Sequence, residues 1–195
     1  YEVPLVVLST FEGPFVPGVN GTWIVSEDKL MEKPVVTGVT YRTDEARLVV
    51  EGMSADIGKM SRLFSELSEK GIFIDMISQE SVETGAVNVS VTVPDESSVI
   101  ALETIQAVVP QIGAVGVKVD RDIAKVSVVG IGMRYHTGVA ARVFEALARE
   151  RIGVTMINTS EIKMSVLVPR KYCEVAVRVL HDEFTEFNLT TEEER

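Results

Sequence analysis

AKVSVVGIGMRYHTGVAARVFEALARERIGVTMINTSEIKMSVLVP, residues 124–169, is the stretch that decides the fold, because it contains a complete structural unit. Its first residues alternate between apolar and polar, which predicts a strand. From Gly138, apolar residues recur at helical spacing, which predicts a helix with Gly153 as its C-cap. Residues 154–157 and 162–168 then predict two further strands.

The same unit occurs a second time upstream, in residues 46–94. When Ala46 is aligned with Ala124, glycines, phenylalanines, arginines and methionines fall at matching positions, and Pro94 meets Pro169. Matches between such different residue types are not expected by chance, and an internal repeat fixes the architecture. The sequence therefore predicts two copies of one module.

The first copy predicts the order strand, helix, strand, strand, helix, strand, and the second follows the same order as far as its second helix. This order gives an α+β module with a four-stranded antiparallel sheet and both helices on one face, the ferredoxin-like arrangement. Asp95 is the predicted N-cap of the second helix in the first copy, and Pro110 and Gly113 are predicted to end it. In the first copy the predicted elements are strand 46–53, helix 58–70, strands 72–80 and 86–94, helix 96–109 and strand 115–120.

The second copy has no convincing last strand after its predicted helix at 170–184, whereas residues 35–41 alternate as a strand without a partner. Assigning this strand to the second sheet makes the first module an insertion within the second. The predicted domains are a leading segment with a linker at 1–34, a first module at 46–120, a second module at 35–45 plus 121–187, and an acidic tail at 188–195.

Composition and charge narrow the function classes. The chain has 195 residues, of which 46% are hydrophobic and 25% charged, which suits a globular protein with two modest cores. The net charge of -10 argues against nucleic acid and anionic membrane as partners, since both need clustered Lys and Arg. No apolar run is long enough to span a membrane. The first residue is Tyr, which suggests a piece of a longer polypeptide.

The thiol and imidazole groups are few. Cys173 is the single cysteine, so no intrachain disulfide forms, and we expect a cytoplasmic protein in a reducing compartment. His136 and His181 lie in different predicted elements, without a carboxylate or cysteine cluster at ligand spacing. The sequence therefore predicts neither a metal site nor a bound cofactor.

The turn after residue 129 contains residues that two classes of enzyme use. Gly130 and Gly132 begin like a dinucleotide fingerprint, but Tyr135 stands where the third glycine belongs, and the sheet is predicted to be antiparallel. An acylphosphatase-like activity would use Arg134 in this turn, and only analogy of fold supports it. We expect no independent catalysis by this chain.

Both copies place a glycine-bearing turn, a helix N-terminus and the polar end of a strand at the same point. These are residues 53–58 with 74–80, and residues 133–138 with 155–161. Free N–H groups at a helix N-terminus attract a carboxylate, and strand-end carbonyls or an Asp hold an ammonium. That pair of charges describes a free amino acid. On the residues alone, simple turns explain the pattern equally well.

The residues resemble the tandem ACT regulatory region of aspartate kinases. AKVSVVGIGMR, GVAARVFEALA, MINTSEIKMSVLV and KYCEVAVRVLH carry the resemblance in the second copy, and EKPVVTGVTY and FIDMISQ extend it upstream. The resemblance implies two ACT modules, a homodimer through them, a kinase domain or catalytic subunit as partner, and lysine, threonine or both as feedback effectors. The family's catalytic Lys-Phe-Gly-Gly-Thr segment is absent, so the chain is expected to be inactive alone, with ATP and Mg belonging to the kinase domain.

The resemblance also implies an effector site, bound where modules of paired chains meet. The turn from Ser54 to Lys59 would receive the carboxylate, Asp75 and Gln79 would hold ammonium or polar groups, and the second copy would line the partner side or keep its strand in register. The expected effector-binding residues are Met53, Ser54, Asp56, Ile57, Gly58, Lys59, Ile74, Asp75, Gln79, Asn158, Ser160 and Glu161.

A rival hypothesis is a dimerisation or assembly module of the same enzyme that senses no ligand. Ala55 and Glu80 favour it, because the family usually has Asp and Asn at these two positions. Asp75, Gln79 and the intact second copy favour amino-acid sensing.

Overall fold

The computed structural model describes residues 5–7, 22–24, 35–83, 85–131, 133 and 136–193. The chain divides into two compact units, residues 1–34 and residues 35–195. In the first unit, β1 (Leu5–Val7) pairs with β2 (Thr22–Ile24) in antiparallel fashion. The remainder of the predicted leading strand and linker lies outside the described residues.

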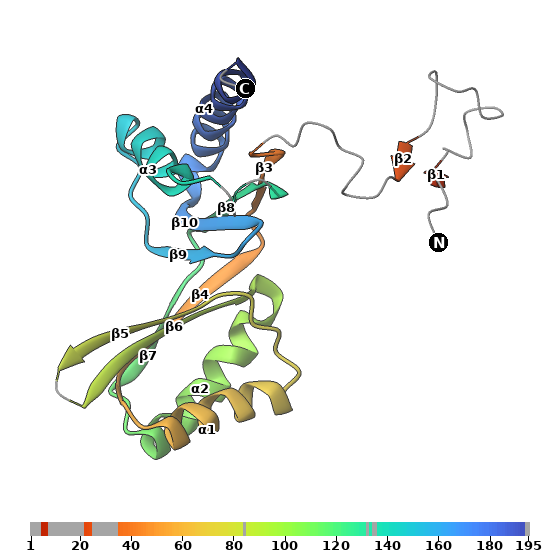
Figure 1. Cartoon of the computed structure of the whole chain (residues 1–195). Helices are drawn as coiled ribbons and strands as arrows, with labels where there is room; N and C mark the ends of the chain where they lie inside the picture. The colour runs from red at the N-terminus through yellow and green to blue at the C-terminus, as the bar shows by residue number, and fades with distance from the viewer. Residues whose placement is uncertain are drawn as a thin grey trace. The chain divides into compact units, whose positions relative to one another are not determined.

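The first module is a four-stranded antiparallel sheet covered on one face by two helices (Figure 1). Its strand order is β5-β6-β4-β7. Alternate side chains of β4 and β6, such as Leu48 and Val91, pack against Leu63 of α1 and Ile105 of α2. The elements are β4 (Glu45–Ser54), α1 (Ile57–Glu69), β5 (Ile77–Glu83), β6 (Ala86–Pro94), a 3₁₀ turn (Asp95–Ser97), α2 (Ser98–Ile112) and β7 (Gly116–Asp120).

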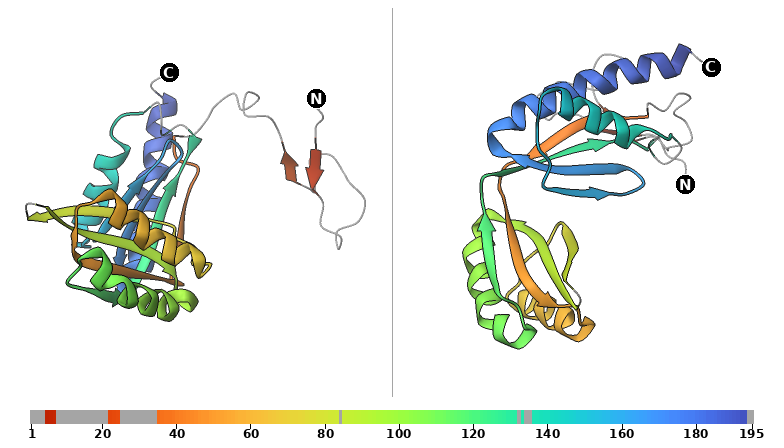
Figure 2. Two further views of the ribbon diagram at one scale, coloured as in Figure 1. Left: turned by 90° about the horizontal axis from the view of Figure 1, so that it is seen from below. Right: turned by 90° about the vertical axis from the view of Figure 1, so that its left-hand side faces the viewer.

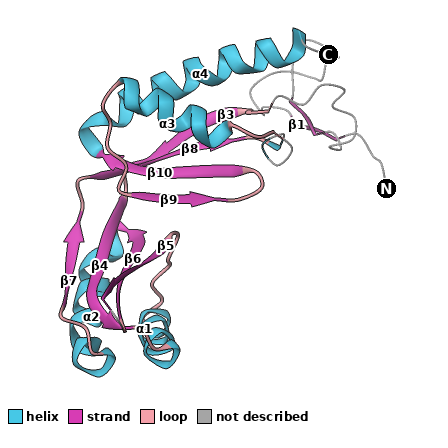
Figure 3. Cartoon of the chain, turned by 60° about the vertical axis from the view of Figure 1, so that its left-hand side comes forward, coloured by secondary structure: helices cyan, strands magenta, loops and turns pink. Residues whose placement is uncertain are grey.

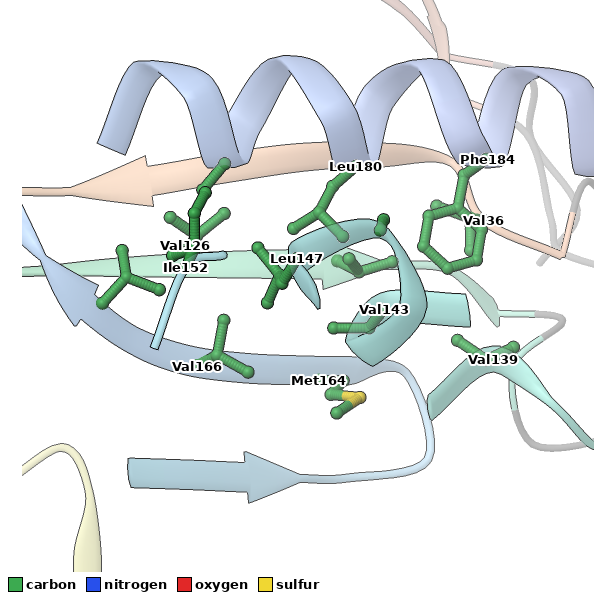
Figure 4. Close-up of a cluster of buried hydrophobic side chains, with 14 of the residues drawn as sticks. Val36, Val126, Val139, Val143, Leu147, Ile152, Met164, Val166, Leu180 and Phe184 are labelled. Atoms are coloured by element: carbon green, nitrogen blue, oxygen red, sulfur yellow. The ribbon is translucent and has the colours of Figure 1, made fainter. Parts of the chain in front are cut away.

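The second module repeats this plan, with strand order β3-β8-β10-β9 and with α3 and α4 on one face of the sheet (Figures 2 and 3). Its core joins Val126 and Val166 of the sheet to Leu147 of α3 and Leu180 of α4 (Figure 4). The elements are β3 (Gly38–Arg42), β8 (Ile123–Val129), α3 (Val139–Arg149), β9 (Met156–Thr159), β10 (Lys163–Pro169), a 3₁₀ turn (Arg170–Tyr172) and α4 (Cys173–Glu193).

The pairing of β3 with β8 confirms the predicted insertion. Thr40 lies opposite Ser127, so the strand that precedes the first module completes the sheet of the second. The chain enters this sheet beside Gly130, where a Cβ would lie 2.1 Å from the carbonyl oxygen of Val35. Gly130 therefore allows the two backbones to approach closely, as expected for a glycine at such a contact.

Three predictions about helix ends are wrong. Pro110 lies inside α2, which continues to Ile112 because a proline in the last turn costs one hydrogen bond while the flanking residues are buried. Asp95 caps no helix N–H, since a 3₁₀ turn begins at this residue and its carboxylate pairs with Arg121 at 3.2 Å. The left-handed residue after α3 is Arg151, with φ of 56°, instead of Gly153.

Most predicted boundaries lie within three residues of those observed, and two differ by more. The strand predicted at 72–80 begins at Ile77, because the amides of Asp75 and Met76 bond to the carbonyl and hydroxyl oxygens of Thr92 instead of continuing the strand ladder. The predicted acidic tail continues α4 as far as Glu193. Gly113 is confirmed as the left-handed C-cap of α2, with φ of 67°.

Candidate functional site

The N-terminus of α1 is built by its own cap. Asp56 has extended backbone angles, and its carboxylate accepts the N–H of Lys59 at 3.1 Å. The N–H of Ala55 donates to Gly85 O at 2.9 Å, which ties this turn to the β5–β6 hairpin. A Cβ at Gly58 would lie 3.0 Å from Asp56 Oδ1, so glycine there leaves room for the capping carboxylate.

Two backbone N–H groups at this helix end have no acceptor within the helix. The N–H groups of Ile57 and Gly58 belong to the first turn of α1, where no earlier carbonyl of the helix can accept them. The positive end of the helix dipole lies at the same place. The turn therefore offers a pair of N–H donors to an anion, next to the negative charge of Asp56.

A pocket of about 170 Å³ opens at this helix end, lined by Ala55, Asp56, Ile57, Met60 and Gln79. Gln79 comes from β5 and lies opposite Val89, a core residue, so its side chain is on the helix-covered face of the sheet. A side-chain amide both donates and accepts hydrogen bonds. The pocket thus combines N–H donors, a carboxylate and an amide, which are complementary to the carboxylate and ammonium of a free amino acid.

Glu80 lies on the other face of β5. It pairs with Asn88, while its neighbour Gln79 pairs with Val89. Successive side chains of a strand point to opposite faces, so the Glu80 carboxylate is directed away from the face on which the pocket opens. Its charge is therefore no obstacle to an anion beside Gln79.

Four other residues expected at the first-copy site lie elsewhere. Met53 is completely buried in the first core, and Ile74 packs against the same core. A Cβ built on Gly113 would lie 3.2 Å from Lys59 Nζ and 3.7 Å from Ser54 Cβ. Ser54 and Lys59 therefore lie beside the C-terminus of α2, where an ammonium is favoured by the helix dipole.

Asp75 already holds an ammonium, and it is that of Lys125 in the second module. The distance from Asp75 Oδ2 to Lys125 Nζ is 2.5 Å, and Lys125 also pairs with Glu45. Asp75 does not line the pocket that contains Gln79. The structure thus brings together Asp56, Ile57 and Gln79, with Gly58 next to them, and places Asp75 at a different point.

The expected residues of the second copy lie on and after β9. Asn158 is opposite Ser165 of β10. Ser160 closes the β9–β10 turn, since its Oγ accepts the N–H of Lys163 at 3.1 Å and its own N–H donates to Lys163 O at 2.7 Å. Glu161 is an exposed residue of the same turn. Arg134 and Tyr135, on which the acylphosphatase-like and dinucleotide readings depend, lie outside the described residues.

Sequence reasoning missed Met60 and Lys125. Met60 is one helical turn beyond the cap residue Asp56, so its spacing was a usable signal for the pocket. Lys125 gave no such signal, because it belongs to the other module and alternates with core residues in a strand.

The described residues contain no group of three or more metal-ligating side chains. They also contain no helix long and apolar enough to cross a membrane. Burial raises the pKa of the Cys173 thiol, which keeps this cysteine protonated and unreactive.

Comparison with known proteins agrees with the two repeats. A family model described as an ACT domain matches residues 47–108 and again residues 126–184. An aspartate kinase of Stutzerimonas stutzeri is 41% identical over 186 residues, which cover 94% of this chain and 44% of that protein. An aspartokinase of Pseudomonas aeruginosa is 42% identical, with the same shares covered. The chain therefore spans less than half the length of these curated relatives.

Solved structures show the same arrangement. The ligand-free regulatory subunit of aspartate kinase from Thermus thermophilus is 35% identical with a TM-score of 0.73, covering 77% of this chain and 99% of that one. The aspartokinase alpha and beta subunit structure gives 41% identity, the same TM-score and the same coverage. With both repeats matched and both sheets in place, the chain belongs to the ACT-domain family, as a tandem regulatory region of aspartate kinases.

Proposed function

We propose that this chain senses a free amino acid, lysine, threonine or both, and thereby controls an aspartate kinase in the cytoplasm. The observation that carries the proposal is the pocket at the N-terminus of α1, where Asp56, Gln79 and the first-turn N–H groups lie together. The effector carboxylate lies against the N–H groups of Ile57 and Gly58. Its α-ammonium faces the Asp56 carboxylate, and Gln79 holds a remaining polar group.

Inhibition follows from differential binding. An effector shifts a conformational equilibrium only as far as it binds one state better than the other. The phosphoryl transfer itself, with its ATP and Mg, belongs to a kinase domain or catalytic subunit. This chain supplies the effector site and the arrangement of modules that responds to it.

A homodimer through the modules is the second part of the proposal. Phe64 of α1 and Phe144 of α3 occupy equivalent positions in the repeats, as do Ile77 of β5 and Ile157 of β9. Phe64 is partly buried against the first core and lines a pocket formed by residues of α1, and the other three are exposed apolar residues. β5 and β9 are edge strands of their sheets, and an edge strand presents unpaired N–H and C=O groups that can pair with another chain.

Isothermal titration of the chain with lysine, with threonine, and with each in the presence of the other tests the sensor proposal. Heat from one amino acid alone identifies the effector, and heat only from the pair indicates concerted control. The absence of heat in every titration, with a folded dimer in the same sample, contradicts the sensor proposal and supports the assembly-module alternative.

Gln79→Ala localises the site. Loss of a hydrogen bond to a charged or polar effector group weakens binding by about tenfold or more. Gln106→Ala is the matched control, since Gln106 is an exposed glutamine on α2 outside the pocket. Equal affinities of the two variants would place the effector elsewhere.

A further inference from the structure

Two short connectors join the modules. Residues 43–44 lie between β3 and β4, and residues 121–122 lie between β7 and β8. Arg170 bridges them, because its Nη2 donates to Thr43 O at 2.7 Å and to Arg121 O at 2.9 Å. A pair of two-residue connectors side by side has the form of a hinge, at which small changes in backbone angles rotate one module against the other.

A second point of attachment lies outside the connectors. Asp75 and Met76 belong to the segment between α1 and β5 of the first module, and both contact the second module. Asp75 pairs with Lys125 of β8 at 2.5 Å. Met76 is buried together with three apolar residues of the second module, Ile123, Met156 and Leu167. We call Asp75–Met76 the docking segment.

Two of the charges at this attachment, Lys125 and Glu45, are buried, and Asp75 is 25% exposed. The Lys125 side chain is 7% exposed and pairs with both Asp75 and Glu45. The second oxygen of Glu45, Oε2, is buried and accepts no hydrogen bond from the described residues. Arg42 Nε is 3.6 Å from Glu45 Oε1. Removing the ammonium leaves the Glu45 carboxylate buried without its cation, whereas removing the Asp75 charge leaves Lys125 paired with Glu45 alone and frees the segment that carries Asp75.

The docking segment is continuous with the strand that carries the pocket glutamine. Met76 directly precedes β5, and Gln79 is the third residue of that strand. The amides of Asp75 and Met76 bond to Thr92 of β6, which fixes the segment to the same sheet. A movement of the segment is therefore transmitted to Gln79 along one strand.

We propose that the docking segment is a latch, which uses the Lys125 ammonium as an internal ligand and couples the effector pocket to the orientation of the second module. Asp75 is then a positioning residue that binds this internal ammonium, and the effector never contacts it. The coupling between the effector pocket and the second module rests on the proposed function, whereas the latch itself does not.

Hydrogen exchange on the whole chain without effector tests the latch. Asp75→Asn keeps the side-chain shape and removes the charge, and Lys125→Met removes the ammonium. Lys125→Met is expected to accelerate exchange of the Met76 amide by roughly a hundredfold, as for a buried carboxylate left without its cation. Asp75→Asn is expected to accelerate it by about tenfold, as for the loss of one charged hydrogen bond. Lys118→Met is the matched control, because its pair with Glu51 at 2.6 Å is exposed. Unchanged exchange in Asp75→Asn overturns the latch.

Chemical rescue tests the ammonium itself. Lys125→Ala removes the side chain beyond Cβ, and added propylammonium supplies the missing propyl chain and charge. Propylammonium is expected to restore slow exchange at Met76, whereas propan-1-ol, which has the same length and no charge, is not. Equal rescue by both compounds shows that packing alone holds the segment and overturns the ionic latch. Asp75→Asn decides the question if Lys125→Ala does not fold.

Titration of the same variants with lysine and threonine tests the coupling. Asp75→Asn is expected to change the effector Kd by about fivefold or more, although Asp75 does not line the pocket. An unchanged Kd together with accelerated exchange overturns the coupling. The latch would then hold the two modules together without affecting the effector pocket. No binding by the unsubstituted chain refutes the sensor function and the coupling with it, while the exchange result still decides the latch.

Discussion

At the scale of single residues, Gly130 has the least room for a side chain among the glycines that the structure describes. A Cβ there would lie 2.1 Å from Val35 O and 2.7 Å from Val36 Cα, and both atoms belong to the backbone. The contact cannot be relieved by rotating a side chain. Gly130→Ala is therefore expected to lower the free energy of unfolding by about 3 kcal/mol, at the upper end of overpacking costs, as measured by urea denaturation.

Gly38→Ala is the matched control for this substitution. Gly38 lies in β3, opposite Val129 of the same sheet, and a Cβ there would meet no atom within 4 Å. Its cost is expected to be below about 0.5 kcal/mol, as for an ordinary surface change. Similar losses in the two variants would contradict the explanation by backbone contact.

Asp56 is expected to contribute both to stability and to ligand binding. Its carboxylate caps α1 through the N–H of Lys59, and Asn replaces Asp well at such a position. Asp56→Ala is expected to lose about 1 kcal/mol of unfolding free energy, while Asp56→Asn loses little. In titration calorimetry, however, Asp56→Asn should weaken effector binding, because it removes the charge that faces the ammonium. If Asn preserves affinity, the ammonium does not face residue 56.

Residue spacing predicted the pocket better than it predicted the ion pairs. Asp56, Ile57 and Gly58 lie within one turn, and Gln79 follows from strand alternation once its face is known, so local rules reach them. The partner of Asp75 is Lys125, 50 residues away in the other module. No periodicity in the sequence relates these two positions. The pairing becomes visible only when the modules are placed against each other.

At the scale of elements, α3 and α4 are joined by one partly buried carboxylate. Glu183 of α4 accepts from Arg142 at 2.9 Å and also pairs with Arg149, and Arg142 lies 4.3 Å from the ring centre of Phe187. Burial opposes ionisation of Glu183, but the hydrogen bonds from the two arginines outweigh it and leave its pKa below the ordinary value of 4.5. The junction of the two helices therefore depends on an ionised carboxylate.

Glu183→Gln tests this dependence. A carboxyl whose pKa is lowered by folding stabilises the fold fully above its unfolded value, and this stability is lost as the pH falls through the folded value. The variant is expected to cost about 1 kcal/mol at pH 7, as for one charged hydrogen-bonded group. In urea denaturation across pH, the difference should shrink as the pH falls below the unfolded pKa near 4.5 and vanish once the pH is below the lowered folded pKa. A cost independent of pH would indicate loss of packing instead.

Element types followed from periodicity, whereas helix ends did not. Each of these elements buries one face, so its apolar pattern was sufficient to predict its type. Helical spacing predicted α1 and α3, and alternation predicted β6 and β10. Helix ends depend on local competition. Pro110 remains helical because Val108 and Ile112 beside it are buried, and Arg151 takes the left-handed conformation although Gly153 is two residues away.

At the scale of the whole molecule, the insertion of one module in the other was predictable from a count of strands. In the sequence, the second repeat lacked a fourth strand and the strand predicted at residues 35–41 lacked a partner. In the structure, β3 pairs with β8 and is that fourth strand. The same reasoning applies to the edges that remain. β5 and β9 have no neighbour on one side within residues 35–83, 85–131, 133 and 136–193, and each carries an exposed isoleucine.

Those isoleucines give the test of the homodimer. Ile77 is 56% exposed and Ile157 is 48% exposed, at equivalent positions of the repeats. In a dimer that pairs these edges both side chains are removed from water, so a carboxylate there would be buried without a partner. Ile77→Glu and Ile157→Glu are each expected to raise the dimer dissociation constant by about a hundredfold or more, as measured by sedimentation equilibrium.

Ile100→Glu separates edge pairing from a general effect of surface charge. Ile100 is 52% exposed, as much as the two edge residues, but it lies on α2 and away from both edge strands. It should leave the dissociation constant unchanged. Loss of the dimer in this variant alone would move the interface to the helical face of the first module. Loss in the two edge variants, with effector heat abolished at the same time, would show that the second chain completes the effector site.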